Sequence, residues 1–348
     1  MTINFRSDNE SPAADAILSA LQEANSGPAH AYADDDWSLQ LNARFSELFG
    51  TETTVIPLST GTAANSIALA AVTPPWGAVY CQRNAHVYTD ESGAPEFYGN
   101  GLRLVPVEGD DGLIDRNAMM GLIRANTGHG VHSYAPSAVS LTQSTERGTV
   151  YTPEQIAAIT GEAKKLGMAT HMDGARFANA VASLDCHPAD VTWKAGVEML
   201  SFGASKNGCM AAEALLLFDH HDLRETAERL RKRSGHLLSK MRYVSAQLLA
   251  YIADGLWLEL AANANRQAAR FAFAVGAHPE ARLEFPVEAN EVFVSWSEDG
   301  FRQLEAAGIE FLMWPERDNL ARFVFSHNTT DAETATLCKA LDPPVGTA

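Results

Sequence analysis

The sequence has few cysteines, and the four it contains are far apart. Cys81, Cys186, Cys209 and Cys338 form no CxxC pair, so they predict neither a zinc site nor a disulfide framework. We interpret them as buried or partly buried thiols, because unpaired cysteine is often found in protein cores. No metal site is predicted. The segment 1–12 lacks the apolar stretch of a signal peptide, which favours a cytoplasmic location.

Long hydrophobic runs and basic residues are also scarce. No apolar run is long enough to span a bilayer. The 348 residues include 26 Lys and Arg against 43 Asp and Glu, a formal net charge of −17. This charge argues against nucleic acid and against anionic membranes as partners, because both bind basic surfaces. The motifs GxGxxG and GxxxxGK are absent as well, which disfavours a nucleotide-dependent enzyme.

The apolar segments that are present predict an α/β fold. Strands alternate with helices over roughly two thirds of the chain, and this alternation implies parallel crossovers and a mainly parallel sheet covered on both faces. Strands are expected at 53–58, 78–81, 102–107, 138–142, 168–172 and 214–218, with helices at 37–49, at 63–72 and after the capping box at Thr152.

The remainder of the chain has a different pattern. Residues 222–252 are predicted to form one long helix that is basic in its first half. Strands and helices then alternate at 292–296, 300–307, 321–326 and 331–341, which predicts a small α+β domain. We therefore divide the chain into an N-terminal arm (1–14), a large domain (15–240) and a small C-terminal domain (241–348). Within the arm, Ser11 and Pro12 are expected to begin a helix.

One lysine is placed where a flat ring could approach the backbone. Lys206 follows an apolar run and has small neighbours such as Gly203 and Gly208. Asp173 ends another apolar run, and Gly61 with Thr62 opens an Ala-rich helix whose N–H groups favour an anion. A lysine for a Schiff base, an acid for a pyridinium nitrogen and a helix start for a phosphate are what pyridoxal phosphate requires.

Each of these features also has a purely structural interpretation. Asp173 could cap a helix before Gly174, and the helix that starts at Gly61 could be capped without a ligand. Arg176, about one turn from Asp173, could form a surface ion pair. His86 follows a strand end, where α/β enzymes bind ligands, although most single histidines are structural.

Taken together, these residues resemble the threonine aldolase and β-eliminating lyase family of fold-type-I pyridoxal phosphate enzymes. The resemblance covers nearly the whole chain. It implies a mainly parallel seven-stranded central sheet flanked by helices, and a homodimer or homotetramer with shared active sites. The matching segments are Arg6-Ser7-Asp8, Tyr32 with Asp34-Asp35, Thr60 to Asn65, Ala85-His86 with Glu91, Ser140-Leu141, His171 to Arg176, Ser205-Lys206, and Arg322 with His327.

The resemblance also implies roles for individual residues. Lys206 would hold the cofactor, Asp173 would pair with its pyridine nitrogen and His86 would stack on its ring. Either His86 or His132 would be the catalytic base. The other implied roles are phosphate binding by Gly61 and Thr62, binding of the substrate carboxylate by Ser7, Arg176 and Arg322, and a place for Tyr32 near the subunit interface. Arg242 is expected to reach the phosphate site of a neighbouring subunit.

The implied reaction is cleavage of an L-β-hydroxy-α-amino acid to glycine and an aldehyde. The segments 142–148 and 234–242 depart from the usual family pattern and resemble a branch that includes phenylserine aldolases. Threonine, allo-threonine and phenylserine therefore stay open as substrates. A β-eliminating lyase or an aminotransferase on the same fold is the alternative enzyme, and a non-enzymatic binding protein is the alternative class.

Overall fold

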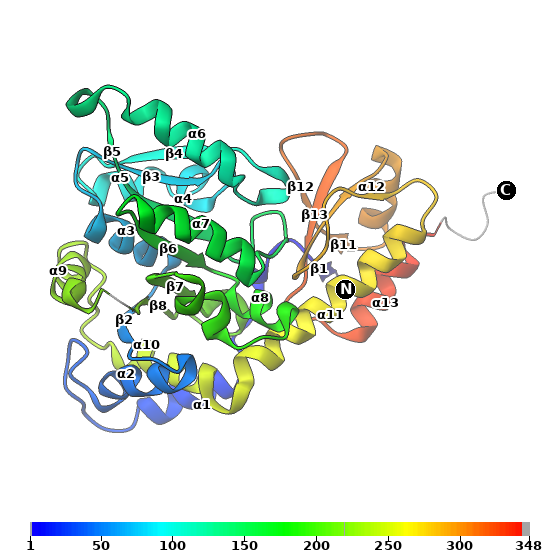
Figure 1. The fold of residues 1–348 in the computed structure, drawn as a ribbon. Helices are drawn as coiled ribbons and strands as arrows, with labels where there is room; N and C mark the ends of the chain where they lie inside the picture. The colour runs from blue at the N-terminus through cyan, green and yellow to red at the C-terminus, as the bar shows by residue number, and fades with distance from the viewer. Residues whose placement is uncertain (1, 219, 343–348) are drawn as a thin grey trace.

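A seven-stranded sheet forms the centre of the protein, in a computed structural model that describes residues 2–218 and 220–342 (Figure 1). The strand order is β2-β8-β7-β6-β5-β3-β4. β8 is antiparallel to β2 and to β7, whereas the other pairs of neighbouring strands in this sheet are parallel, so the predicted mainly parallel sheet is confirmed. The strands are β2 (Thr54–Leu58), β3 (Gly77–Gln82), β4 (Arg103–Val107), β5 (Ala135–Thr142), β6 (Ala169–Gly174), β7 (Met199–Gly203) and β8 (Glu213–Leu217).

Helices cover both faces of this sheet because its strands are apolar on both sides. In β2, Ile56 and Leu58 pack in a cluster with α3 (Gly61–Val72) and α9 (Arg224–Arg233), whereas Val55 packs in the cluster of the opposite face. This alternation follows from the two-residue period of a strand. The opposite face is covered by α2 (Asp36–Phe49), α6 (Arg116–Thr127), α7 (Pro153–Lys165) and α8 (Phe177–Leu184).

A second, smaller sheet lies toward the C-terminal end of the chain (Figure 1). Its strands pair antiparallel in the order β12-β13-β10-β9. The N-terminal strand β1 (Ile3–Asn4) pairs in parallel with β11 (Ile309–Glu310), so the predicted arm is attached to this part of the protein. The other elements here are β9 (Arg282–Leu283), β10 (Glu291–Ser295), β12 (Leu312–Met313), β13 (Leu320–Val324), α12 (Glu298–Ala306) and α13 (Asp331–Lys339).

Two predicted helices differ from the structure. The single helix expected at 222–252 is wrong, because α9 ends at Arg233 and α10 (Arg242–Ile252) begins a separate helix. Gly235 lies between them with φ of 84°, a left-handed conformation that interrupts a helix. Ser11 does not begin a helix either, since it follows the 3-10 turn Asp8–Glu10 and α1 (Asp15–Ala24) starts later.

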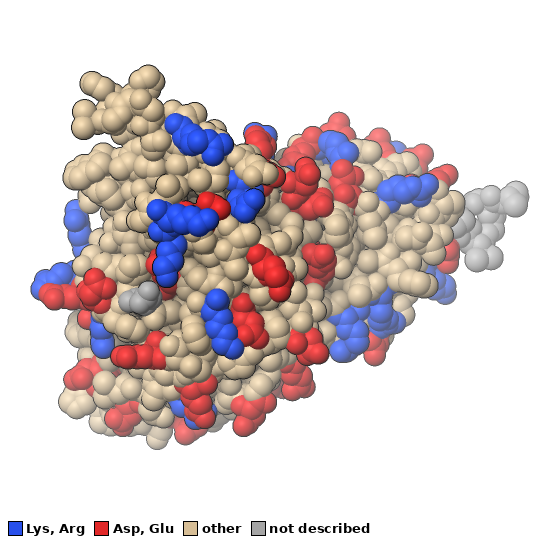
Figure 2. Space-filling model, in the orientation of Figure 1, with Lys and Arg blue, Asp and Glu red and all other residues tan. Residues whose placement is uncertain are grey.

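The helix α11 (Leu256–Ala277) joins the two packed cores. Ala261 still belongs to the core of the large sheet, whereas Ala268 and Phe271 of the same helix pack in the core of the small sheet. The domain division at 240/241 stays a prediction. Among the described residues, no helix has the length and apolar character needed to cross a membrane. On the face shown in Figure 2, acidic and basic side chains are interspersed.

Candidate active site

A polar cavity of about 340 Å³ lies where several strands of the large sheet end. Parallel strands place their carboxyl ends at one edge of a sheet, which is where open α/β sheets bind ligands. Six of the residues predicted from the sequence line this cavity, together with acids that the sequence did not single out. The six are Gly61, Thr62, His86, Asp173, Arg176 and Lys206.

One wall of the cavity combines the lysine with the start of a helix. Lys206 lies in the 3-10 turn Ser205–Asn207, directly after β7. Gly61 and Thr62 are the first residues of α3, whose N-cap Thr60 accepts a hydrogen bond from the Ala63 N–H at 3.3 Å. The first N–H groups of a helix have no acceptor within it. A Cβ at Gly61 would meet no atom within 4 Å, so this helix start is open to a phosphate-sized anion.

Asp173 is held at the end of β6 by two hydrogen bonds. Its Oδ1 accepts the Ala175 N–H at 3.0 Å, and its Oδ2 accepts the Asn65 Nδ2–H at 2.8 Å. The same Asn65 amide donates to Glu91 Oε1 at 2.8 Å. Asn65, Glu91 and Asp173 are all buried, so a buried amide separates two carboxyl groups that would otherwise repel each other.

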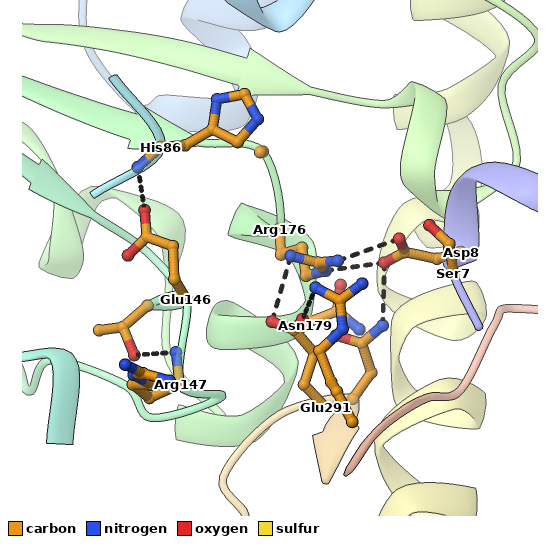
Figure 3. A network of polar contacts seen from close by, with 12 residues as sticks. Ser7, Asp8, His86, Glu146, Arg147, Arg176, Asn179 and Glu291 are labelled. Atoms are coloured by element: carbon orange, nitrogen blue, oxygen red, sulfur yellow. Dashed lines mark hydrogen bonds and ion pairs between the residues drawn. The ribbon is translucent and has the colours of Figure 1, made fainter. Parts of the chain in front are cut away.

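His86 begins the short helix α4 (His86–Thr89) and is held at both its ring and its backbone. Its Nδ1 lies 2.9 Å from Glu91 Oε1. Its backbone N–H donates to Glu146 Oε1 at 2.8 Å (Figure 3). The hydrogen bond to Glu91 raises the pKa of His86, although partial burial opposes this and the charge of Asp173 supports it. Burial raises the pKa of Glu146 to about 7.

Arg176 stands at the opposite side of the cavity between two acids (Figure 3). Its Nε and Nη2 donate to the two carboxylate oxygens of Asp8 at 2.7 and 3.0 Å, and its Nη1 lies 3.1 Å from Glu291 Oε2. Burial opposes the ionisation of Asp8, yet Arg176 and Lys206 lower the Asp8 pKa below its ordinary value. The guanidinium is therefore fixed in position at the cavity wall.

Comparisons with known proteins agree with this geometry. The family model described as beta-eliminating lyase matches residues 4–299. The chain belongs to the beta-eliminating lyase family. It is 42% identical over 328 residues to a low specificity L-threonine aldolase of Pseudomonas aeruginosa, covering 94% of each chain. It is 40% identical over 333 residues to another from Pseudomonas sp. (strain NCIMB 10558), covering 96% of this chain and 95% of the relative.

A solved structure is similar over almost the whole length. The threonine aldolase of Leishmania major superimposes with a TM-score of 0.91 at 27% identity, covering 97% of this chain and 98% of that one. Threonine aldolases and beta-eliminating lyases are fold-type-I enzymes that use pyridoxal phosphate. The resemblance inferred from the sequence and the predicted fold are thus confirmed.

Five residues that the sequence predicted for the active site lie outside the cavity. Ser7 accepts a hydrogen bond from the Asn9 N–H at 3.2 Å and lines a neighbouring hollow. Arg322 on β13 lies 3.3 Å from Glu291 Oε1, so it joins the network around Arg176 without lining the cavity. The other three are Tyr32, Arg242 and His132.

Tyr32 and Arg242 point to other parts of the chain. The Tyr32 ring is half exposed and lies 4.8 Å from the Lys232 ammonium group. Arg242 begins α10 and donates to the Gly27 carbonyl at 2.9 Å. Within one chain, neither side chain contributes to the cavity.

The prediction of His132 as a base needs a correction. His132 lies in the 3-10 turn Gly130–His132 before β5 begins, whereas Thr142, at the other end of that strand, lines the cavity. A strand of this length spans roughly 25 Å at about 3.3 Å per residue. His132 therefore lies at the edge of the sheet opposite to the cavity, and it cannot act at the cavity of its own chain.

Several acids at the site were not assigned a role from the sequence. Glu146 and Glu213 line the cavity, and Glu291 pairs with Arg176. The signal for Glu213 was present, because it stands as a single charge within an apolar segment and charged residues are seldom buried without a reason. Within 2–218 and 220–342, no group of three His, Cys, Asp or Glu side chains could hold a metal ion.

Proposed function

We propose that this protein is a pyridoxal phosphate-dependent aldolase that cleaves L-β-hydroxy-α-amino acids of the threonine, allo-threonine or phenylserine type to glycine and an aldehyde. The observation that carries this proposal is the meeting of Lys206, Asp173 and the start of α3 in one cavity. His86 and Arg176 face the same cavity, and the family membership and the similarity to threonine aldolases support the same reaction.

The residues present fit the cofactor. The N–H groups of Gly61 and Thr62 offer donors and a helix dipole to its phosphate. Lys206 offers the amine for its aldehyde, and the buried Asp173 offers a carboxylate for its ring nitrogen. When bound, pyridoxal phosphate supplies an electron-withdrawing ring that stabilises negative charge on the substrate Cα.

Arg176 would bind and orient the substrate carboxylate. A guanidinium group has five N–H donors. In Arg176, Asp8 takes two of them and Glu291 lies beside Nη1, so the remaining donors on Nη1 and Nη2 are left for the substrate carboxylate. Ser7 and Arg322 would assist from the adjacent network. Such fixation holds the bond to be broken in the orientation that favours its cleavage.

His86 would be the base. Because Glu91 takes the Nδ1 side of the ring, Nε2 is left to accept a proton. The O–H bond of the substrate β-hydroxyl breaks and its proton moves to Nε2. The Cα–Cβ bond then breaks, the aldehyde leaves and the electron pair stays on Cα, which is protonated to give glycine.

We also infer a homodimer or homotetramer with shared active sites. Tyr32, Arg242 and His132 are exposed or bound elsewhere within their own chain. The predicted places of Tyr32 and Arg242, and any contribution of His132 beside the base His86, are therefore at the cavity of a neighbouring subunit. Apart from Lys206 and Arg176, no Lys or Arg side chain lines the described cavity. In this arrangement, Arg242 of a neighbouring subunit would supply a further cationic group for the phosphate.

The test uses the purified protein and a panel of β-hydroxy amino acids. We expect a visible absorbance band from bound cofactor and release of glycine from at least one of threonine, allo-threonine and phenylserine. Lys206→Ala should lose both, whereas the matched surface variant Lys164→Ala should keep both. A Lys206→Ala protein that keeps both would exclude this lysine. Turnover that requires a keto acid would indicate an aminotransferase instead.

A further inference from the structure

Glu213 stands between the helix start and the lysine of the candidate active site. It is the first residue of β8, and the sheet register places it beside Leu58 on β2 and Gly203 on β7. Leu58 precedes the turn that leads into α3, and Gly203 precedes the turn that carries Lys206. Glu213 thus lines the same cavity as Gly61, Thr62 and Lys206, at the ends of the strands that lead to the expected phosphate site.

The contacts of Glu213 leave its charge poorly compensated. The side chain is buried, and its Oε1 accepts the Ser205 N–H at 3.3 Å. Among the ion pairs of the described residues, none includes Glu213, so no cationic nitrogen lies within 4 Å of its carboxyl group. The Ser205 hydroxyl and backbone N–H both favour the ionised form of Glu213, but these neutral donors could equally bind a phosphate oxygen.

The other titratable groups around Glu213 do not remove this imbalance. Lys206, on the turn after β7, favours the ionised form of Glu213, and Asp173, on β6, disfavours it. Cys209 and the Tyr251 hydroxyl of α10 also sense its charge, and both are buried and neutral at ordinary pH. Burial is the largest influence and raises the pKa of Glu213 to about 7.

A carboxylate and a phosphate dianion that lie side by side in one partly buried cavity repel each other strongly. We propose that Glu213 takes up one proton when the phosphate group of the cofactor enters the cavity, and that it remains beside the phosphate as a neutral carboxylic acid. The proton comes from solvent and forms the O–H bond of the acid, which can donate to a phosphate oxygen. This inference rests on the proposed function, because that function defines the phosphate site.

The proposal predicts a pH-dependent affinity for the phosphorylated cofactor. If binding requires the neutral acid, the affinity falls as the pH rises above the pKa of Glu213, by up to about tenfold per pH unit. Glutamine at this position has the same shape and keeps an oxygen for the Ser205 N–H, but it cannot ionise. Glu213→Gln should therefore remove this part of the pH dependence.

The experiment compares the full-length proteins after removal of cofactor. Pyridoxal phosphate affinity is measured near pH 6.5 and near pH 8.5, and proton uptake is measured by calorimetry in two buffers of different ionisation enthalpy. Between these pH values, the unsubstituted protein should lose roughly ten- to thirtyfold more affinity than Glu213→Gln. At the higher pH it should take up about one more proton per bound cofactor than Glu213→Gln.

Three controls define what the result means. Pyridoxal, which lacks the phosphate, should show no difference between the two proteins, and its binding also reports whether the variant is folded. Glu213→Asp keeps a titratable acid and should keep the pH dependence. Glu198→Gln changes an acid that accepts the Thr170 N–H at 2.8 Å and lines a different hollow, so it should behave like the unsubstituted protein.

Two results would overturn the inference alone. One is the same pH dependence and proton uptake in Glu213→Gln as in the unsubstituted protein. The other is a uniform gain in affinity at both pH values with no change in proton uptake, because Glu213 would then stay ionised beside the phosphate. An unsubstituted protein that shows neither cofactor absorbance nor glycine release would instead contradict the proposed function, and this inference with it.

Discussion

Asp8 and Arg176 lie 168 positions apart in the sequence and form a bidentate ion pair, with N···O distances of 2.7 and 3.0 Å. Asn290 donates to the same Asp8 carboxylate at 3.1 Å, and Glu291 pairs with Arg176 from the other side. The N-terminal residues, the large sheet and the small sheet thus meet at one guanidinium group. Substrate binding and the stability of the fold are therefore expected to depend on the same contacts.

Asp8→Asn should destabilise the protein. The carboxylate is buried, and removal of one partner from a buried ion pair costs about 3 kcal/mol or more. We expect a lower urea midpoint and a higher KM for the substrate. Because Arg176 lowers the Asp8 pKa, this stabilisation is present above the ordinary value of 3.8 and is lost as the pH falls through the lower folded-state value. The effect of the substitution should therefore fade in acid.

The matched control for Asp8 is Glu10→Gln. Glu10 lies 3.5 Å from Arg6 in a partly exposed pair, and such pairs contribute less than about 1 kcal/mol. Equal losses of stability in both variants would mean that the buried ion pair of Asp8 with Arg176 contributes no more to stability than the partly exposed pair of Glu10 with Arg6.

His86 is expected to set the acid limb of the pH–rate profile. His86→Ala should lower kcat by roughly 10²- to 10⁴-fold, the usual contribution of a positioned base. Activity requires the neutral ring, so it falls as the pH drops through the His86 pKa. Since Glu91 raises that pKa, Glu91→Gln should move the acid limb to lower pH.

Glu146→Gln tests whether the acid limb belongs to His86. Glutamine can still accept the His86 backbone N–H but cannot titrate, and burial raises the Glu146 pKa to about 7. We expect the limb to stay in place in this variant. If Glu146→Gln moved or abolished the limb while Glu91→Gln did not, Glu146 and not His86 would be the base.

Asn65→Ala should separate a structural effect from an effect on cofactor binding. Asn65 and Asn179 are both buried helical amides, but only Asn65 bridges Glu91 and Asp173. Both alanine variants should lose about 1–3 kcal/mol of stability through unsatisfied partners. Only Asn65→Ala should also weaken pyridoxal phosphate binding, because Asp173 would lose its orientation. Denaturant unfolding and a cofactor titration measure the two effects, and equal cofactor affinities would contradict the role of Asn65.

Replacement of two glycines by alanine should affect different properties of the protein: its stability at Gly203 and its ligand affinity at Gly61. A Cβ at Gly203 would lie 2.7 Å from the Ala175 Cα, so Gly203→Ala should lower the free energy of unfolding by about 1–3 kcal/mol. A Cβ at Gly61 would meet no atom within 4 Å. Gly61→Ala should therefore keep its melting temperature and lose affinity for inorganic phosphate and for the cofactor. A drop in melting temperature for Gly61→Ala would show that this position is not open.

Subunit mixing tests the role of His132. If His132 serves a neighbouring cavity, His132→Ala and Lys206→Ala proteins should each be impaired, and co-refolded mixtures should recover up to about a quarter of the original activity from dimers with one complete site. The control is a mixture of His86→Ala and Lys206→Ala, because both residues line the cavity of the same chain. That mixture should stay inactive. No recovery in the first mixture would remove His132 from the mechanism.

Local patterns in the sequence were sufficient for the central sheet and for much of the site. The apolar segments before Gly61, Asp173 and Lys206 are strands, and parallel strands bring the residues that follow them to one edge of a sheet. The capping box at Thr152 and Gln155 formed as expected. The prediction of one long helix at 222–252 was wrong because helical periodicity does not reveal where a glycine such as Gly235 adopts a left-handed conformation.

The sequence by itself determined the order of strands and helices, the lysine, the aspartate and the helix start, because each depends on neighbours within a few residues. Only the tertiary structure decided that β1 joins β11, that Asp8 and Glu291 hold Arg176, and that Glu213 stands between the lysine and the helix start. It also decided that His132 lies at the far edge of the sheet. Burial, long-range pairing and shifted pKa values arise from contacts between distant segments, and no local pattern records those contacts.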